Sequence, residues 1–507
     1  MPSYETISLH PQDHLLSQLK STTFDVICIG SGWAGRVLAA RIVKAGLTAV
    51  IIEEQLVGGD CPFWACVPSK ALLRPQEALA EAQAVSGVRE LQGERSSLDA
   101  DTVFKRRDAF TSSWNDGDVL IPMVENSGAV LVRGRGELVG VKRVAVTHEN
   151  GERAELEAKH AVAICTGSDP VIPNIPGLKE SNPWGPRQAT SSSEVPKHLL
   201  VLGAGAVGTE MATVYASLGG QVSLVSRSAE LLPKIDPEAG KLVREGLESQ
   251  GVRVYVSTSV QAVSREEGTE GLLTVQLSDG STVTGVTQIL AATGRKAKTS
   301  GIGLENVGVK MDGSPIAVSE SLDVPAVPGG WLYALGDVNG RAPMSHSSKY
   351  HGRIAANAII ARSQQDGADV PGSNTPWSKV SATNDVLAQP QVVFTRPTVG
   401  SVGMTRTGAE AAGLADKIRI VIAPGATLGA RLHQEGYKDG WAQWIIDRES
   451  NKLVGATFAG DGVAELLHAS TVAIVGGMTV DRLAHAVPPF PTMSEVYLNL
   501  LEAAEGL

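Results

Sequence analysis

The sequence predicts an α/β protein with two parallel-strand units, followed by a C-terminal α+β region. Three observations predict this class. An apolar run is followed by a glycine-rich turn and a helical stretch, the same order recurs 173 residues later, and strands alternate with two helical stretches (462–475 and 494–504) after residue 390. The length of 507 residues fits about three domains.

The first unit begins at residues 24–30, FDVICIG, a short apolar run typical of a buried parallel strand. Gly30, Gly32 and Gly35 then follow in a GxGxxG pattern, and a helical stretch covers 37–45. A second strand ends at Glu53. An acid about 20 residues beyond the glycines is typical of a dinucleotide-binding Rossmann unit, where it binds a ribose hydroxyl.

The second unit repeats this order with the same glycine offsets. A strand at 198–202 leads into Gly203, Gly205 and Gly208, a helix, and a strand at 221–226. A single GxGxxG is weak support, because an ordinary glycine turn has the same pattern. Two copies in the right context predict two Rossmann-type domains, each holding a pyrophosphate at a helix N-terminus.

Composition excludes several classes of function. A net charge of −10 disfavours nucleic acid as a partner. No apolar run reaches 18 residues, so we expect no membrane span. Residues 1–23 lack the pattern of a secretory signal and are expected to form a polar arm, which favours a cytoplasmic location. The basic run at 105–107 is expected on a solvated helix face.

Cysteines point to chemistry rather than to a structural framework. Four in 507 residues are too few for a disulfide scaffold, and none belongs to a cluster with zinc spacing, so no metal site is expected. Cys28 and Cys165 fall at strand positions and are expected in the core. Cys61 and Cys66 are five apart, which on a straight helix is too far for a disulfide, so a bond needs a distorted turn. They form either a redox pair or two buried thiols.

These motifs together resemble the pyridine nucleotide–disulfide oxidoreductases, the flavoprotein family of dihydrolipoamide dehydrogenase, glutathione reductase and mercuric reductase. The resemblance covers nearly the whole chain and rests on the segments GSGWAG, GGDCPFWACVPSK, ICTGS, GAGAVGTE, ATGR, YALGDV and VFTRPTVGSVGMT. It implies three domains: FAD-binding at 24–168 and 296–375, NAD(P)-binding at 169–295, and dimerisation at 380–507. Residues 363–376 read as a linker.

The resemblance also implies roles for individual residues. Cys66 is expected to face the flavin, Cys61 to exchange with substrate, and Lys70 to lie near flavin N5 with Glu210 as its ion-pair partner. Glu53 is expected on the FAD ribose and Asp337 on the ribityl or pyrophosphate side. The residues expected to bind FAD are Gly30, Gly32, Gly35, Glu53, Gly59, Thr166, Gly167, Gly336 and Asp337.

The second unit predicts NADPH as the preferred nucleotide, with NADH as the alternative. Its second strand ends in Ser226 and Arg227, where an NAD-binding unit would carry an acid for the 2′-hydroxyl. A neutral residue followed by arginine suits a 2′-phosphate, although Arg227 could also be an ordinary surface residue. The residues expected to bind the nucleotide are Gly203, Gly205, Gly208, Ser226, Arg227 and Gly294.

One position departs from the family. In its members a His-Pro-Thr segment, with a glutamate five residues after the histidine, serves the disulfide of the partner subunit. Here Phe490 stands at the histidine position, while Glu495 fits the pattern. Phenylalanine carries no proton, and general acid–base help is typically worth about 10²–10⁴-fold. The resemblance implies a homodimer in which Phe490 and Glu495 lie near the disulfide.

The sequence therefore predicts an enzyme that passes hydride from NADPH through FAD to Cys61–Cys66 and on to an unidentified small molecule, a disulfide or another acceptor. One alternative is thiolate-dependent carbon–sulfur cleavage or carboxylation at a site shielded by Phe490. Others are a dithiol oxidase and a non-catalytic dimeric flavoprotein. Both cysteines and the Lys70–Glu210 pair argue against the last of these.

Overall fold

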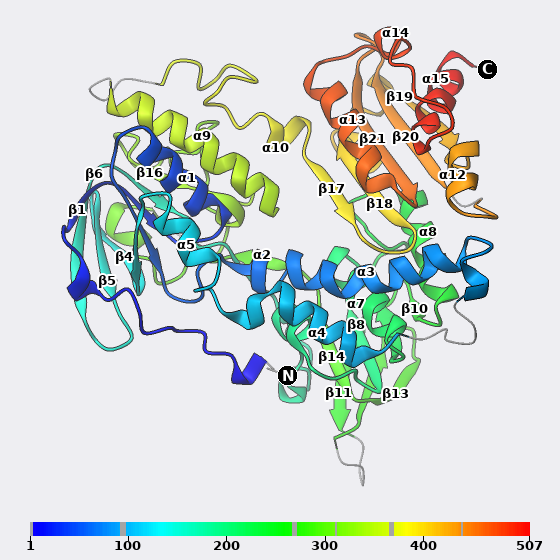
Figure 1. The fold of residues 1–507 in the computed structure, drawn as a ribbon, viewed down its shortest axis with the longest axis horizontal. Coiled ribbons are helices and arrows are strands. Elements are labelled where there is room, and N and C mark those ends of the chain that lie inside the picture. Colours follow the sequence, from blue (N-terminus) through cyan, green and yellow to red (C-terminus); the bar gives the residue numbers. More distant parts are fainter. Residues whose placement is uncertain are drawn as a thin grey trace.

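The first Rossmann-type unit lies within a seven-stranded sheet, at the left of Figure 1. The computed structural model describes residues 4–91, 98–265, 271–309, 312–364, 370–437 and 440–506. Helices α1 (Trp33–Lys44) and α9 (Ser345–Ser363) pack against each other over this sheet. The strands, in spatial order, are β3 (Val130–Arg133), β2 (Ala49–Glu53), β1 (Thr23–Ile29), β6 (Arg153–Ile164), β5 (Arg143–Thr147) and β4 (Arg135–Gly140), with β16 (Leu332–Ala334) paired to β6.

The second unit repeats the strand order of the first. In the first unit β3, β2, β1 and β6 are neighbours, and in the second β10, β9, β8 and β14 take the same positions. Helix α7 (Ala206–Ser217) corresponds to α1. The strands and remaining helices are β8 (His198–Leu202), β9 (Gln221–Val225), β10 (Arg253–Tyr255), β14 (Gln288–Ala291), α6 (Pro186–Ser191) and α8 (Pro237–Ser249), with a three-stranded sheet of β11 (Val260–Arg265), β12 (Leu273–Leu277) and β13 (Thr282–Val286).

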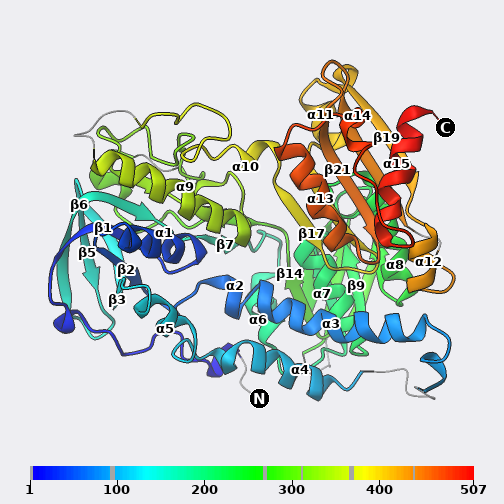
Figure 2. The same ribbon diagram turned by 45° about the horizontal axis from the view of Figure 1, so that its top comes forward.

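Two extended segments connect the two lobes side by side (Figure 1). Strands β7 (Ser168–Pro170) and β15 (Arg295–Ala297) pair in antiparallel fashion there. Helix α3 (Cys66–Gln83) also joins the parts, since it starts beside the first lobe and runs along α7 of the second lobe (Figures 1 and 2). Helices α2 (Asp60–Phe63), α4 (Ala100–Phe110) and α5 (Leu120–Glu125) complete this region.

The C-terminal region is a five-stranded antiparallel sheet with helices packed on it, so the predicted α/β class with a C-terminal α+β domain is confirmed. Its core includes Trp444 and Phe458. The elements are α10 (Asn384–Leu387), β17 (Pro390–Val393), β18 (Thr398–Gly403), α11 (Arg406–Ala411), β19 (Ile418–Pro424), α12 (Leu428–His433), β20 (Trp441–Asp447), β21 (Leu453–Gly460), α13 (Val463–Val475), α14 (Val480–Leu483) and α15 (Val496–Glu505).

The N-terminal arm, described from residue 4, is bound along the first lobe. Tyr4 packs edge-on against Trp64 with ring centroids 5.5 Å apart, and Leu9 joins the same apolar cluster. Asp13 accepts a hydrogen bond of 2.7 Å from Arg133. The predicted linker at 363–376 begins at the last residue of α9, and its residues 365–369 lie outside the described ranges.

One expectation is wrong, because Arg107 in the basic run 105–107 has no solvent exposure. Its guanidinium binds the Asp108 carboxylate at 2.7 Å and donates to the carbonyl oxygens of Thr190 and Ser192. A buried charge is tolerated when it is paired and hydrogen-bonded, and here the partners come from a distant segment.

No helix in the described ranges is long and apolar enough to cross a bilayer.

The buried Arg133 gives a test of the fold. Its guanidinium binds Asp13 and Asp116 and donates to the carbonyl of Gln55. We expect Arg133→Met to cost about 3–5 kcal/mol, because Asp116 would remain as an uncompensated buried charge. The matched control is Arg143→Met, since Arg143 is 53% exposed and pairs with Glu155, and should cost about 0–1 kcal/mol. Equal losses of thermal stability in the two variants would contradict the conclusion that Arg133 compensates the buried charge of Asp116.

Candidate functional site

The first glycine of each turn lies where two strand ends meet. Gly30 and Gly203 have φ angles of +107° and +101°, which side chains rarely adopt. A Cβ on Gly30 would lie 2.4 Å from the carbonyl oxygen of Cys165, and one on Gly203 would lie 2.5 Å from that of Ala292. Both units therefore require glycine here for conformation and for space.

The other two glycines of each turn have different tasks. A Cβ on Gly35 would lie 2.2 Å from the carbonyl oxygen of Gly30, so this glycine lets α1 pack on the turn. Gly208 does the same against Gly203, at 1.9 Å. In contrast, a Cβ on Gly32 would meet nothing within 4 Å. The same is true of Gly205, so each helix N-terminus faces open space suited to an anion.

A cavity of about 380 Å³ extends from the first turn to Cys61. Cys61 lines it, together with the cationic side chains of Arg187, Arg295 and Lys298. The residues that sequence analysis assigned to FAD all line it except Gly35, which packs on Gly30: they are Gly30, Gly32, Glu53, Gly59, Thr166, Gly167, Gly336 and Asp337.

Two charged residues of the first unit, Arg36 and Glu53, lie at or next to the turn that lines this cavity. Buried Arg36 on α1 keeps Nε and Nη2 without a hydrogen-bond partner, and burial lowers its pKa to about 10. Glu53 accepts from the amide and hydroxyl of Ser31, at 2.8 and 2.6 Å, and from the amide of Gln55 at 2.8 Å. The Glu53 carboxylate thus fixes the glycine turn while lining the cavity.

Ion pairs that sequence analysis missed build one wall of the cavity. Arg187 and Arg295 both donate to the Asp60 carboxylate, at 2.8 and 2.6 Å. Ser168 donates to Asp337 at 2.6 Å. Arg295 directly follows Gly294 in the segment ATGR, so its position in a noted motif was an available signal. Arg187 stands in no motif, and only the fold brings it to Asp60.

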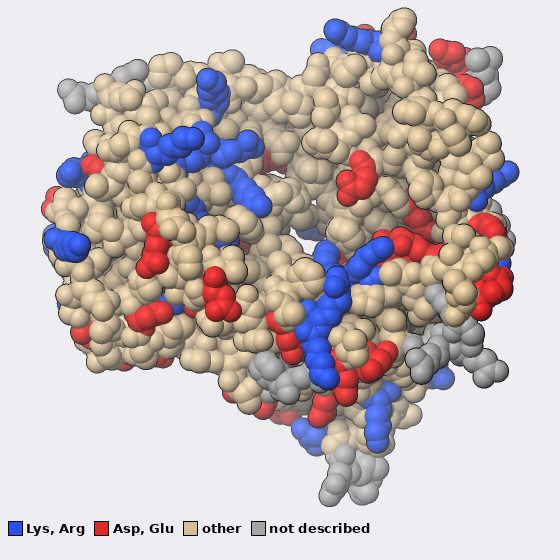
Figure 3. Space-filling view, viewed as in Figure 1, with Lys and Arg blue, Asp and Glu red and all other residues tan. Residues whose placement is uncertain are grey.

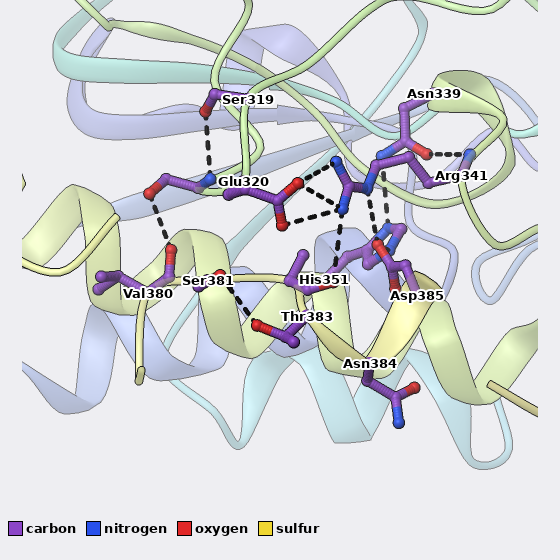
Figure 4. A network of polar contacts seen from close by, with 12 residues as sticks. Ser319, Glu320, Asn339, Arg341, His351, Val380, Ser381, Thr383, Asn384 and Asp385 are labelled. Atoms are coloured by element: carbon purple, nitrogen blue, oxygen red, sulfur yellow. Dashed lines mark hydrogen bonds and ion pairs between the residues drawn. The ribbon is translucent and has the colours of Figure 1, made fainter. Parts of the chain in front are cut away.

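A buried network holds the turn that carries Gly336 and Asp337 (Figure 4). His351 of α9 accepts from the amide of Gly336 through Nδ1 at 3.0 Å, so its proton lies on Nε2 and is donated to Asp385 at 2.9 Å. Arg341 also donates to Asp385, at 2.9 Å, and binds Glu320. This network links the cavity wall to α10, which leads into the C-terminal domain.

Cys61 and Cys66, the predicted redox pair, stand on either side of a break between two helices. Cys61 is in α2, Cys66 is the first residue of α3, and Ala65 between them has non-helical angles (φ −134°, ψ −99°). The distorted turn expected from their spacing is therefore present. Both are free thiols in the structure, and Cys66 Sγ lies 3.1 Å from the Ser345 hydroxyl.

The surroundings of the pair favour a thiolate on Cys61. A hydrogen bond from Cys66 outweighs burial, and with help from Ser345, Trp33 and the positive charge of Lys349 it lowers the pKa of Cys61 to about 6. The hydrogen bond to Cys61, burial and the negative charge of Cys61 in turn raise the pKa of Cys66. The assignment of Cys66 to the flavin side and Cys61 to the substrate side stays a prediction, and an ionised Cys61 suits the attacking role.

The other two cysteines are core residues, as expected. Cys28 and Cys165 are buried, and burial raises the pKa of Cys28 to about 12 and that of Cys165 well above its usual value.

Lys70 and Glu210 form the expected ion pair. The Lys70 ammonium binds both carboxylate oxygens of Glu210, at 2.9 and 2.7 Å, and lies 4.8 Å from the ring centroid of Phe394. The amide of Phe394 donates to Glu210 at 3.0 Å. Since α3, α7 and the β17–β18 loop each supply one partner, this junction fixes α3 and its cysteine against the rest of the chain.

The nucleotide residues of the second unit lie at the carboxyl end of its sheet. Ser226 directly follows β9, is buried, and accepts from the amide of Ser228 at 3.2 Å, while Arg227 is exposed. Gly294 follows β14, with a φ of +139°. Ligands of open α/β sheets bind at this edge.

Phe490 and Glu495 belong to the C-terminal domain. Phe490 is 71% exposed, and Glu495 accepts a hydrogen bond of 2.7 Å from the amide of Gly429 at the start of α12. Their expected role at a partner's disulfide stays a prediction. No group of three or more His, Cys, Asp or Glu side chains that could hold a metal occurs among the residues that the structure describes.

Comparison with known proteins gives full-length relatives. The chain is 31% identical to a mercuric reductase of Streptomyces lividans, covering 94% of each. It is 29% identical to a dihydrolipoyl dehydrogenase of Bacillus subtilis, covering 95% of this chain and 96% of the relative.

Solved structures share the fold. The HOCl-induced flavoprotein disulfide reductase RclA of Escherichia coli aligns with a TM-score of 0.78 at 23% identity, covering 95% of this chain and 99% of RclA. LpdA of Mycobacterium tuberculosis aligns with a TM-score of 0.77 at 23% identity, covering 96% of this chain and all of LpdA.

Two family models cover most of the chain. Residues 24–358 match the pyridine nucleotide-disulphide oxidoreductase model, and residues 389–501 match the dimerisation domain of the same family. These matches confirm the resemblance found in the sequence and the prediction of an oxidoreductase acting on sulfur groups. The chain belongs to the pyridine nucleotide-disulphide oxidoreductase family.

Proposed function

We propose that this protein is an FAD- and NADPH-dependent reductase of small disulfides, with Cys61 and Cys66 as its redox pair. The family is FAD-dependent and takes electrons from NAD(P)H. The observation that carries the proposal is the position of Cys61, which lines the dinucleotide cavity in surroundings that stabilise its thiolate.

The residues present suit FAD in the first unit. The open N-terminus of α1 beside Gly32 would receive the pyrophosphate, and Arg36 of α1, whose Nε and Nη2 have no hydrogen-bond partner, adds positive charge. Glu53 and Asp337 line the same cavity as Cys61. Bound FAD would supply electron transfer from the nicotinamide nucleotide to the cysteine pair.

When reduced, Cys61 and Cys66 can carry out thiol–disulfide exchange and supply the first proton themselves, from Cys66. The Cys61 thiolate attacks one sulfur of the substrate, forming a mixed disulfide and breaking the substrate sulfur–sulfur bond. The first leaving thiolate takes the proton of Cys66, and the Cys66 thiolate then attacks Cys61 and closes the Cys61–Cys66 bond. The second thiol leaves as a thiolate and takes a proton from water, so two electrons pass from the pair to the substrate.

These exchange steps need no acid–base group at position 490, where this chain has phenylalanine. A histidine would stabilise the Cys61 thiolate and deliver a proton, but Trp33, Ser345 and Lys349 stabilise the thiolate from within the chain. Because its pKa is raised, Cys66 keeps a proton for the leaving group.

We propose a homodimer assembled through the C-terminal domain. Residues 389–501 match a dimerisation domain. Large apolar side chains are exposed there, which is typical of surfaces that bind another protein. They include Leu428, Leu432, Val472, Val475, Val487, Phe490 and Leu498.

Alkylation of the reduced protein tests the thiolate. The rate of Cys61 modification by iodoacetamide should rise with pH around a midpoint near 6, because the thiolate is the nucleophile. Trp33→Phe should move this midpoint upward, since the ring is kept and the N–H is lost. Trp377→Phe, at a half-exposed tryptophan elsewhere, is the control. A midpoint of about 8.5 in the wild type would refute a stabilised thiolate.

The preference for NADPH rests on Arg227. We expect Arg227→Glu to lower the ratio of kcat/KM for NADPH over NADH at least tenfold, because a carboxylate would repel the 2′-phosphate. Arg253→Glu is the matched control, because this exposed arginine begins β10 at the other end of the same sheet. If Arg227→Glu leaves the ratio of kcat/KM for NADPH over NADH unchanged, Arg227 does not determine a preference for NADPH.

A further inference from the structure

Trp33 and Lys349 lie beside Cys61 and contact each other. Trp33 fills a variable position of the first glycine turn, begins α1 and lines the cavity beside Cys61. The ammonium of Lys349, an exposed residue of α9, lies 3.6 Å from the ring centroid of Trp33. Arg36 lies 4.3 Å from the same ring, so the indole contacts two cations.

Exposed basic side chains cover the two helices that carry this pair. Lysine and arginine side chains gather over α1 and α9 in Figure 3. Neither helix contains an acidic residue, although the whole chain has a net charge of −10. Four of the cations are exposed, namely Arg41, Lys44, Lys349 and Arg353. These two helices are therefore positively charged, whereas the whole molecule is negatively charged.

The charge has a physical consequence at the thiol. Cys61 must ionise to attack, and a thiolate repels any substrate that is itself negative. Lys349 offsets this repulsion because its positive charge is close enough to stabilise the Cys61 thiolate. Exposed cations along one approach also raise the encounter rate with anions.

We propose that Trp33 and Lys349 form a cationic entrance to Cys61 that selects disulfides carrying carboxylates over neutral or cationic ones. The proposal rests on the disulfide reductase function above and names its substrate class. Trp33 positions Lys349 through the cation–π contact, and Lys349 attracts the substrate carboxylate while Cys61 attacks the adjacent sulfur–sulfur bond.

The first experiment measures the charge at the entrance without requiring turnover. Reduced protein is alkylated with iodoacetate or iodoacetamide, and modification of Cys61 is followed by peptide mapping. Both reagents react with the thiolate, so the ratio of their rates does not depend on the Cys61 pKa. Lys349→Glu should lower the iodoacetate-to-iodoacetamide ratio about tenfold at low salt, and Lys349→Met should lower it less.

The control variant replaces another exposed lysine, far from Cys61 in the chain, with glutamate. Lys241→Glu lies on α8, where Lys241 is 59% exposed, and should leave the ratio unchanged. The wild-type ratio should also fall as salt is raised toward 1 M, where the screening length is about 3 Å. A ratio that does not respond to Lys349→Glu would overturn the cationic entrance.

The second experiment tests selection with three disulfides of similar size: 3,3′-dithiodipropionate, bis(2-hydroxyethyl) disulfide and cystamine. The wild type should give the highest kcat/KM for the dianion and the lowest for the dication, and Lys349→Glu should reduce that ratio at least tenfold. If the alkylation ratio responds but no disulfide is turned over, the reductase function fails and the cationic entrance stands. Equal kcat/KM for all three disulfides would overturn the selection.

Discussion

The pairing of Glu210 with Lys70 is the interaction on which the site depends. A carboxylate that is only 6% exposed must be compensated, and here one ammonium and one backbone amide do so. Because these groups come from α3, α7 and the β17–β18 loop, the carboxylate has all of these partners only when all three parts are assembled. It also fixes α3, which begins at Cys66, next to the second nucleotide unit.

In the proposed mechanism, the electrostatic surroundings of Cys61 substitute for the histidine that the family pattern predicts at position 490. The family position for an acid–base histidine holds Phe490, yet the chain surrounds Cys61 with an indole N–H, a hydroxyl and a lysine. These groups stabilise a charge but cannot shuttle protons as imidazole does. The pair must then rely on Cys66 and water for protons, which favours substrates whose leaving thiols are acidic.

The sequence predicted what depends on local backbone constraints. Gly30 and Gly203 were recognisable because only glycine tolerates their conformation and the nearby carbonyl, and the break between Cys61 and Cys66 followed from their spacing. Arg107 was misjudged, since its burial depends on carbonyls 83 and 85 residues away. The His351 network and the Trp33–Lys349 contact escaped for the same reason, because each joins segments that no sequence pattern relates.

The central claim is that electrons pass from a nicotinamide nucleotide into the bond between Cys61 and Cys66. An anaerobic reductive titration with NADPH tests it directly, comparing the oxidised wild type with a Cys61→Ser/Cys66→Ser variant. The account predicts that the wild type consumes one more equivalent of NADPH per chain than the variant and gains two titratable thiols. Equal consumption by both proteins, with no new thiols, would contradict it.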